Sequence, residues 1–259
     1  MNFDTIFIPY MISKAQVKHI RSLDDKKKRY EYKQFVVEGI KMVDELLKSQ
    51  YEIVEIFATQ YWISNHATSG ISKLKISLIT EQSLSRISGL KTPNEVLALV
   101  VMPDATSIPN FDKALALDNI QDPGNLGSII RIADWFGIST IICNAQTVDV
   151  YNPKVLQATM GSVFRVTCYY TDLLNYIIQQ TSIKTYAAVL NGSNVNEMEK
   201  ITNGLILIGN ESVGIDEKLI QHCDFEISIP QKGNAESLNA AVATGIICNT
   251  LFKSIEPLL

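Results

Sequence analysis

The sequence predicts an α/β protein with two domains. Apolar segments of strand length alternate with segments of helical periodicity along most of its 259 residues. The segment Pro103–Pro109, which holds two prolines and small polar residues, divides this alternation into two parts. Strands that alternate with helices form largely parallel sheets covered on both faces, and ligands of such sheets bind at the carboxyl ends of the strands.

The part of the chain ahead of Pro103 is expected to form a small α/β domain. Ser13 is a suitable N-cap for a helix over 13–23, in which Val17, Ile20 and Leu23 repeat at helical spacing. Further helices are expected over residues 38–49 and 81–87. Strands are expected over residues 34–37, 51–58, 73–79 and 95–102.

The alternation resumes after Pro109 and continues to the end of the chain. Strands are expected over residues 114–120, 139–143, 164–169, 185–190, 205–208 and 225–229. Helices are expected over residues 125–136, 153–159, 172–180 and 237–252. The last of these helices is apolar nearly all round, which predicts that it is buried and that a second subunit could cover part of it.

Composition excludes several classes of protein. With 46% hydrophobic and 19% charged residues, the chain has a globular composition. Its longest uninterrupted apolar run, Val96–Met102, has seven residues, whereas a membrane-spanning helix needs about 20. Asp4 stands where a signal peptide would carry positive charge, so we expect a mature cytoplasmic protein. The four cysteines and three histidines show no metal-ligand spacing, so no metal site is expected.

Charge differs between the two parts of the chain. Residues 1–108 carry a net charge of +2 and residues 109–259 a net charge of −6. The segment Lys14–Lys33 contains eight basic and three acidic residues, interleaved with Tyr30 and Tyr32. It is able to neutralise phosphates and to offer rings to unstacked bases, although a solvated helix face is the alternative interpretation. The candidate RNA contacts are Lys26, Lys27, Lys28, Arg29 and Lys33.

Three segments of the second domain carry polar residues directly after a strand. The first is LDNIQDPGNLGSIIRIADWFG at 117–137, where a helix is expected to begin at Asn125 just beyond a strand, which is a natural anion site. Arg131 lies off the apolar face of this helix. Its position therefore favours a functional role, with a solvated surface arginine as the alternative.

The second segment, LILIGNESVGI at 205–215, is an apolar strand followed by Gly209, Asn210, Glu211 and Gly214. Ile215-Asp216 stands where a Walker A loop requires Lys-Ser/Thr, and the chain lacks G-x-G-x-x-G, so neither nucleotide motif is present. Ordinary turn chemistry remains an alternative for the glycines.

The third segment, ISIPQKGNAESLNAAVATGIICN at 227–249, places Asn239 in the first turn of the expected last helix. A polar amide near buried surface needs a hydrogen-bond partner or a ligand. Asn239 is therefore a candidate site residue.

Together these segments resemble the three ordered motifs of the SpoU/TrmH family of RNA ribose 2′-O-methyltransferases, in the SPOUT superfamily. The matching residues are NLGSIIR at 125–131, GNESVG at 209–214 and IPQKGNAESLN at 229–239. Residues 21–47, RSLDDKKKRYEYKQFVVEGIKMVDELL, also resemble the substrate-binding domain that often precedes this catalytic domain. The resemblance covers nearly the whole chain.

The resemblance implies a fold and a domain plan. It implies a mostly parallel Rossmann-like sheet with a deep trefoil knot in the C-terminal part, preceded by a small α/β domain with a ribosomal-protein-like fold. The implied domains are an RNA substrate-binding domain at 1–103, a linker at 104–111 and a methyltransferase domain at 112–259. It further implies a homodimer that binds S-adenosylmethionine and structured RNA.

The resemblance also implies the site residues, carried over by motif position. The residues implied to line the catalytic centre are Asn125, Arg131, Glu211, Ser237 and Asn239. The residues implied to contact the cofactor are Leu190, Gly209, Asn210, Ile229, Pro230, Gly233 and Leu238.

The implied activity is transfer of a methyl group to a ribose 2′-hydroxyl of rRNA, with tRNA as the second choice. One alternative is a catalytically silent RNA-binding or ribosome-assembly factor on the same fold. Another is a nucleotide-dependent open-sheet enzyme, which the missing glycine fingerprints disfavour.

Overall fold

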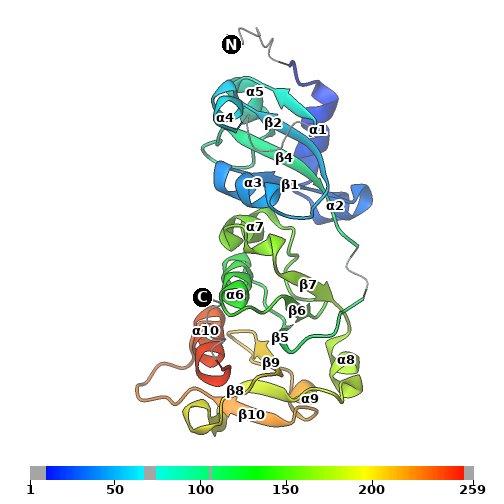
Figure 1. Ribbon diagram of the computed structural model, residues 1–259. Coiled ribbons are helices and arrows are strands. Elements are labelled where there is room, and N and C mark those ends of the chain that lie inside the picture. The colour runs from blue at the N-terminus through cyan, green and yellow to red at the C-terminus, as the bar shows by residue number, and fades with distance from the viewer. Residues whose placement is uncertain (1–9, 67–73, 105–106, 254–259) are drawn as a thin grey trace. The chain divides into compact units, whose positions relative to one another are not determined.

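The computed structural model describes residues 10–66, 74–104 and 107–253, which form two compact units (Figure 1). The N-terminal unit comprises Met1–Asp104 together with Tyr151–Phe164, and the C-terminal unit comprises Ala105–Val150 together with Arg165–Leu259. The division after Asp104 falls in the expected linker, of which residues 105 and 106 lie outside the described residues.

The N-terminal unit is built on a four-stranded mixed sheet with the order β1-β4-β2-β3. Its strands are β1 (Gln34–Glu38), β2 (Ile53–Ala58), β3 (Ile76–Leu78) and β4 (Val96–Val101). The central strand β4 pairs antiparallel with β1 and β2, whereas β2 and β3 are parallel. All four strands were expected, but β3 is shorter than predicted, and Lys73, at the start of the predicted strand, lies outside the described residues.

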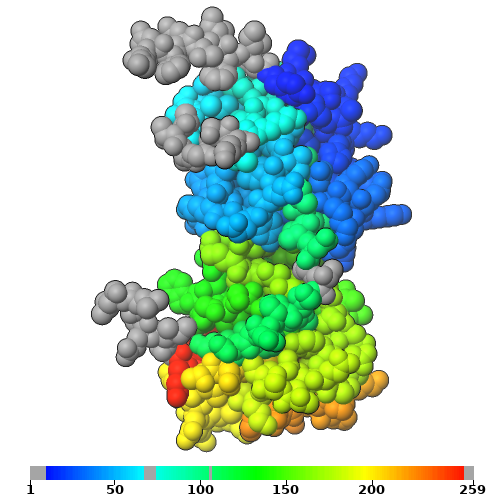
Figure 2. Space-filling view, turned by 45° about the vertical axis from the view of Figure 1, so that its right-hand side comes forward, coloured from blue at the N-terminus to red at the C-terminus, as the bar shows by residue number. Residues whose placement is uncertain are grey.

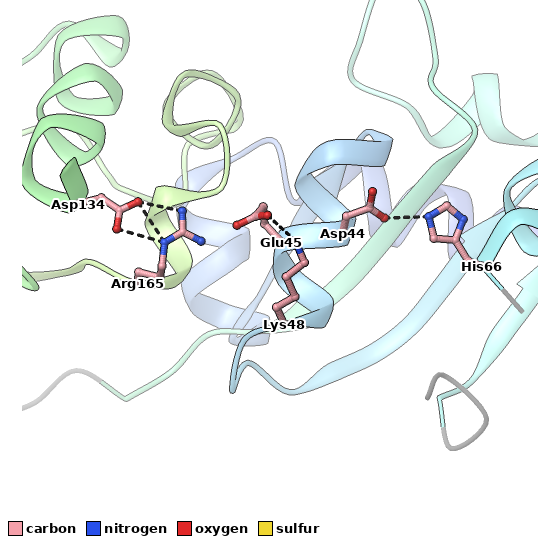
Figure 3. A network of polar contacts seen from close by, with 6 residues as sticks. All are labelled: Asp44, Glu45, Lys48, His66, Asp134 and Arg165. Carbon is pink, nitrogen blue, oxygen red and sulfur yellow. Dashed lines mark hydrogen bonds and ion pairs between the residues drawn. The ribbon is translucent and has the colours of Figure 1, made fainter. Parts of the chain in front are cut away.

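Most of the described helices of the N-terminal unit begin at a capping side chain. They are α1 (Lys14–Ser22), α2 (Lys26–Tyr32), α3 (Ile40–Leu47), α4 (Gln60–His66), α5 (Glu81–Ile87) and α7 (Pro153–Thr159). Ser13 forms a capping box with Gln16, as its position predicts. Helix α4 was not predicted. Its His66 ring lies 2.8 Å from the carbonyl oxygen of Trp62 and 3.0 Å from Asp44 on α3 (Figure 3), and so links the two helices.

The segment Tyr151–Phe164 completes the core of the N-terminal unit, although the sequence places it in the second domain. The ring of Tyr151 lies 4.6 Å from that of Phe35, and Phe164 lies 5.4 Å from Tyr51. Gln157 donates to the carbonyl oxygen of Glu38 at 2.9 Å. Because these contacts join residues more than 100 positions apart, local sequence pattern carries no sign of them.

The C-terminal unit contains a six-stranded sheet with the order β10-β8-β9-β5-β6-β7, and every pair in it is parallel. Its strands are β5 (Lys113–Asp118), β6 (Thr140–Cys143), β7 (Thr167–Tyr170), β8 (Thr185–Asn194), β9 (Gly204–Gly209) and β10 (Phe225–Ser228). The prediction of a largely parallel sheet is confirmed.

Helices cover both faces of this sheet. They are α6 (Pro123–Trp135), α8 (Leu173–Gln179), α9 (Glu217–Ile220) and α10 (Ala240–Leu251). Figure 1 shows α6 and α10 on one side and α8 on the other. Ala114 and Leu205 of the sheet belong to a buried cluster with Leu173 and Ile177 of α8. Within the part of the chain that the structure describes, no helix has the length and apolar character needed to cross a membrane.

Helices α6 and α10, which carry the motif residues, start at residues other than those predicted. Helix α6 begins at Pro123 because the Asp122 carboxylate caps it by accepting from the backbone N–H of Asn125. Helix α10 begins at Ala240 rather than Ser237, and Asn239 is its N-cap. Both shifts follow from capping side chains, which satisfy N–H groups that the first helical turn leaves free.

Strand β8 and strand β10 pair in two separate stretches. Ala187 pairs with Glu226, but the next residue of β10, Ile227, pairs with Ser193, so residues 188–192 leave the ladder. A Cβ at Gly192 would lie 2.6 Å from the backbone nitrogen of Ile227, which explains why this position is a glycine. The chain is therefore tightly packed on itself in the C-terminal part. The trefoil knot expected there stays a prediction.

Candidate active site

The strand order brings the three polar segments to one edge of the sheet. Strands β10, β8, β9 and β5 are consecutive neighbours, and all run parallel. The first segment follows β5, the second follows β9 and the third follows β10. Their loops therefore leave from adjacent carboxyl ends, which is where open parallel sheets bind ligands.

The loop after β9 folds back on itself. The backbone groups of Asn210 and Gly214 bond to each other in both directions, at 3.1 and 2.9 Å. Gly214 has a φ of 75°, and a Cβ at Gly209 would lie 2.3 Å from the carbonyl carbon of Gly214. The Asn210 side-chain oxygen accepts from the N–H of Ser212 at 2.8 Å. This tight loop presents the side chain of Glu211.

Hydrogen bonds join one residue from each of the three segments. The Asn125 amide donates to Glu211 Oε1, and the Asn239 amide donates to Asn125 Oδ1 at 2.8 Å. The Asn239 oxygen remains available to cap α10, where it accepts from the N–H of Ala241 at 3.0 Å. The need for a partner predicted for Asn239 is thus met by Asn125. Three of the five expected catalytic-centre residues form one connected row.

The other two, Arg131 and Ser237, are exposed and do not join this row. In residues 10–66, 74–104 and 107–253, Arg131 has no hydrogen-bond or ion-pair partner. Arg165 differs from it, since it donates to both carboxylate oxygens of Asp134 on the same helix α6, with a shortest contact of 2.8 Å (Figure 3). The Arg131 guanidinium is therefore free to bind an anion.

The residues expected to contact the cofactor lie on the loops of three neighbouring strands. Leu190 belongs to the part of β8 that does not pair with β10. Gly209 is the last residue of β9 and Asn210 follows it, and the remaining residues follow β10. Leu190 and Leu238 expose 69% and 45% of their surface. Exposed apolar side chains beside a glycine loop suit a ligand with an apolar or aromatic part. The residues in this group that follow β10 are Ile229, Pro230, Gly233 and Leu238.

Two residues beneath these loops were missed by sequence reasoning. Asp118 is the last residue of β5, and Asn144 directly follows β6. The Asn144 amide donates a hydrogen bond of 2.6 Å to the Asp118 carboxylate. Burial raises the pKa of the Asp118 carboxyl above its ordinary value. A polar residue directly after an apolar strand was the available signal in both cases.

The basic candidates for RNA contact lie on α2 of the N-terminal unit or at its end. Lys26 and Lys27 are exposed, Lys28 is half-buried, and Lys33 is the left-handed C-cap with a φ of 52°. Lys26 Nζ lies 5.8 Å from the centre of the Tyr30 ring. Figure 2 shows the side chains of this blue part of the chain protruding from the surface.

Arg29 does not belong to this exposed set, which corrects the prediction from sequence. Only 2% of its surface is exposed, and its guanidinium donates to the carbonyl oxygens of Leu23 and Asp24 at 2.8 and 2.9 Å. These carbonyls follow the end of α1, where free acceptors need donors. Arg29 therefore holds α2 against the end of α1.

Comparison with known proteins adds independent information. Residues 112–249 match the model of the SpoU rRNA Methylase family, and residues 14–98 match the MRM3-like substrate binding domain. The chain is 32% identical to the 23S rRNA (guanosine(2553)-2′-O)-methyltransferase RlmP of Bacillus subtilis, over 90% of this chain and 94% of that protein.

Solved structures agree with this match. The AdoMet-bound rRNA methyltransferase of Sinorhizobium meliloti superimposes with a TM-score of 0.82 at 30% identity, over 94% of this chain and 96% of that one. The SpoU methyltransferase AviRb of Streptomyces viridochromogenes, solved with AdoMet, gives 0.80 at 25% identity, over 92% and 97%. From its motifs, its parallel sheet and these matches, the chain belongs to the SpoU rRNA methylase family.

Proposed function

We propose that this protein transfers a methyl group from S-adenosylmethionine to a ribose 2′-hydroxyl of ribosomal RNA. The observation that carries the proposal is the row Asn239–Asn125–Glu211, which joins the three family motifs at one edge of the sheet. The relative in Bacillus subtilis is named for this reaction on 23S rRNA. A purely structural factor would not need these three polar side chains to meet at one edge of the sheet.

The loops after β8, β9 and β10 fit the cofactor. Gly209 allows the β9 loop to close without a side chain in the way, and Leu190 and Leu238 offer apolar surface. Apart from its chain neighbours, no atom of the described residues lies within 4 Å of a Cβ placed at Gly233, so that loop leaves open space beside its backbone. When bound, the cofactor supplies an activated methyl group. The residues proposed to hold it are Leu190, Gly209, Asn210, Ile229, Pro230, Gly233 and Leu238.

The side chains of this site orient the substrate and form no covalent bond with it. Methyl transfer to an oxygen depends mainly on alignment, so positioning supplies most of the rate. The row Asn239–Asn125–Glu211 presents fixed polar groups beside the exposed Ser237. The positive guanidinium of Arg131 binds substrate phosphate and stabilises charge on the ribose oxygen. The proton of the hydroxyl passes to an RNA phosphate oxygen or to water, not to Arg131.

The direct test uses total RNA from a host strain that lacks the gene. Purified protein and S-adenosylmethionine labelled in the methyl group are added, and the RNA is digested to nucleosides. Label in a 2′-O-methylnucleoside of rRNA supports the proposal, and label in tRNA only would move the substrate to the second choice. Cofactor binding without label in any RNA would instead favour a silent RNA-binding factor.

The proposed domain plan follows the same comparison. We assign RNA substrate binding to 1–103, a linker to 104–111 and methyl transfer to 112–259. The segment Tyr151–Phe164 lies in the methyltransferase part of the sequence but packs in the N-terminal unit. We also place the protein in the cytoplasm, where ribosomal RNA is assembled with protein in bacteria such as the relative's source.

The proposed enzyme is a homodimer formed through α6 and α10. These helices pack together, since a Cβ at Gly245 would lie 3.7 Å from Ile132 Cδ1. Both leave large apolar side chains in solvent, with Trp135 85% and Val242 52% exposed. Large exposed apolar side chains on two packed helices are typical of a subunit interface. The unpaired Arg131, one turn before Trp135, lies on α6 as well.

Val242→Asp is expected to convert the dimer to a monomer, because it places a charge in the apolar interface. Light scattering coupled to gel filtration measures the mass directly. The matched control is Ile178→Asp on α8, which covers the other face of the sheet and is 49% exposed. A monomeric wild-type protein at micromolar concentration, or a dimeric Val242 variant, would contradict this interface.

The RNA-contacting surface is proposed to consist of Lys26, Lys27, Lys28 and Lys33 on and after α2. Tyr30 and Tyr32 are 39% and 44% exposed between these lysines, so part of each ring faces solvent, where an unstacked base would contact it. We call these residues the α2 surface. It combines phosphate neutralisation with stacking, as single-stranded parts of structured RNA require.

Replacing Lys26, Lys27 and Lys28 by alanine is expected to weaken RNA binding by about 10-fold or more at 0.1 M salt and to reduce the salt dependence of log K by about 2. Fluorescence anisotropy with labelled rRNA fragments over a salt series measures both. S-adenosylmethionine affinity should not change. Lys48→Ala at the C-cap of α3, with its side chain 71% exposed in the same unit, is the control. Unchanged salt dependence in the triple variant would exclude the α2 surface.

A further inference from the structure

Asp118, a buried carboxylate, lies beneath the loops of the active site and belongs to none of the matched motif residues. It ends β5 and is 7% exposed. Both of its oxygens are engaged, since Oδ1 accepts from the Asn144 amide at 2.6 Å and Oδ2 accepts from the backbone N–H of Asp216 at 2.8 Å. Asp216 directly follows the segment 205–215, so Asp118 holds the far end of the β9 loop.

Asn144 extends this network to the turn that precedes α6. Its side-chain oxygen accepts from the backbone N–H of Asn119 at 3.0 Å, from the N–H of Thr147 at 3.0 Å and from the Thr147 hydroxyl at 2.9 Å. Its amide donates to Asp118. Asn144, which directly follows β6, therefore holds the end of β5 at two consecutive residues, donating to Asp118 and accepting from Asn119.

The turn held in this way is the one that leads to Asn125. Asn119 has a φ of 60°, a left-handed conformation that asparagine tolerates better than most residues. Its carbonyl oxygen accepts from the Asn210 amide of the β9 loop at 2.9 Å. The turn and the loop are thus joined twice, once through Asn119 and Asn210 and once through Asp118 and Asp216.

Packing alone does not require a carboxylate at this place. Neighbouring residues of β5, such as Leu117 and Ala116, are fully buried apolar side chains. Removing a carboxylate from water is costly unless its oxygens are satisfied by donors. Here one donor is the backbone N–H of Asp216, which follows the loop that carries Glu211. The other is the amide of Asn144, which fixes the turn before α6.

We propose that Asp118 and Asn144 are positioning residues for methyl transfer, which set the β9 loop and the turn before α6 relative to each other. Glu211 and Asn125 come from these two segments, and their hydrogen bond depends on that setting. The inference rests on the proposed function. Neither side chain is assigned contact with substrate or cofactor.

Exchanging the side chains of Asp118 and Asn144 tests this hydrogen-bond network. In Asp118→Asn, the new amide at position 118 must direct its hydrogens at either the Asp216 N–H or the Asn144 amide, so one donor faces another. Asn144→Asp alone sets two carboxylates against each other. In the double variant Asp118→Asn/Asn144→Asp, the amide at position 118 donates to the carboxylate at position 144, and every other acceptor is retained. The exchange restores all the hydrogen bonds with one of them reversed.

Three quantities are measured for wild type, both single variants and the double variant. They are the unfolding temperature, the dissociation constant of S-adenosylmethionine by calorimetry, and kcat and KM with rRNA at 25 °C. For folded Asp118→Asn we expect kcat to fall and cofactor binding to weaken, each by about 10-fold or more. The exchanged double variant is expected to return both to within about threefold of wild type.

The outcomes separate positioning from other roles. A folded Asp118→Asn variant with wild-type cofactor affinity and kcat would overturn the inference. So would a double variant that regains stability without kcat, because the carboxylate at position 118 itself would then be needed. If a single variant does not fold, the test uses the double variant. A double variant that does not recover both folding and kcat would contradict the proposed role of Asp118 and Asn144. A wild-type protein that binds cofactor but methylates no RNA refutes the proposed function instead.

Discussion

Arg131→Ala is expected to abolish most turnover while leaving the fold and cofactor affinity unchanged. Arg131 is exposed on α6 and, among the described residues, makes no ion pair whose loss would destabilise the protein. Removal of one preorganised group that stabilises developing negative charge costs about 10²–10³ in kcat. Single-turnover methylation of rRNA with saturating S-adenosylmethionine measures the loss, and calorimetry measures cofactor affinity.

Arg131→Lys distinguishes charge from geometry at the same position. A lysine keeps the positive charge but lacks the planar fork of donors that binds phosphate at two points. We expect this variant to recover only part of the activity. Arg86→Ala, on the exposed surface of α5 in the N-terminal unit, is the control. Equal turnover of Arg131→Ala and wild type would remove this residue from the mechanism.

Asn125→Ala is expected to reduce kcat by about 10²-fold, because it removes the centre of the row that joins the three motifs. Both the Glu211 carboxylate and the Asn239 amide lose their partner in this variant. Asn239 keeps its role as the cap of α10 through its oxygen, so the unfolding temperature should change little. Steady-state methylation assays and thermal unfolding measure the two effects.

Asn125→Asp is expected to be less active than Asn125→Ala, although aspartate has nearly the same shape. It would set a carboxylate against that of Glu211, and like charges at this distance repel. The control is Asn175→Ala on α8, whose side chain donates to the helix-capping residue Asp172. An Asn125→Ala variant with wild-type kcat would show that the row is structural and not part of the site.

Local pattern was sufficient for most of the elements. Ser13 begins a helix because its hydroxyl and Gln16 satisfy the first free N–H groups, and this signal is complete within four residues. Alternation of apolar strands with helices likewise determined the parallel sheet of the C-terminal unit. The predicted start of α10 was wrong because Ser237 and Asn239 are both acceptable N-caps. The hydrogen bond that the backbone N–H of Ala241 donates to Asn239 Oδ1 identifies Asn239 as the cap.

Contacts between distant segments could not be read from such patterns. Arg29 stands in a basic run and was assigned to RNA, but its donors are used by the carbonyls of Leu23 and Asp24. Tyr151 looks like an ordinary residue before a helix, yet its ring packs on Phe35 in the other part of the sequence. In both cases the role of the side chain depends on the residues that lie next to it in the folded protein.

Residue types at fixed local spacing are enough to identify the three motif segments, the order of the elements and the family. Folding is needed to bring Asn125, Glu211 and Asn239 into one row and to place Asp118 and Asn144 beneath it. The difference arises from the strand order. Strands β5 and β9 are neighbours in the sheet but about 90 residues apart in the chain, so their ends meet only after folding.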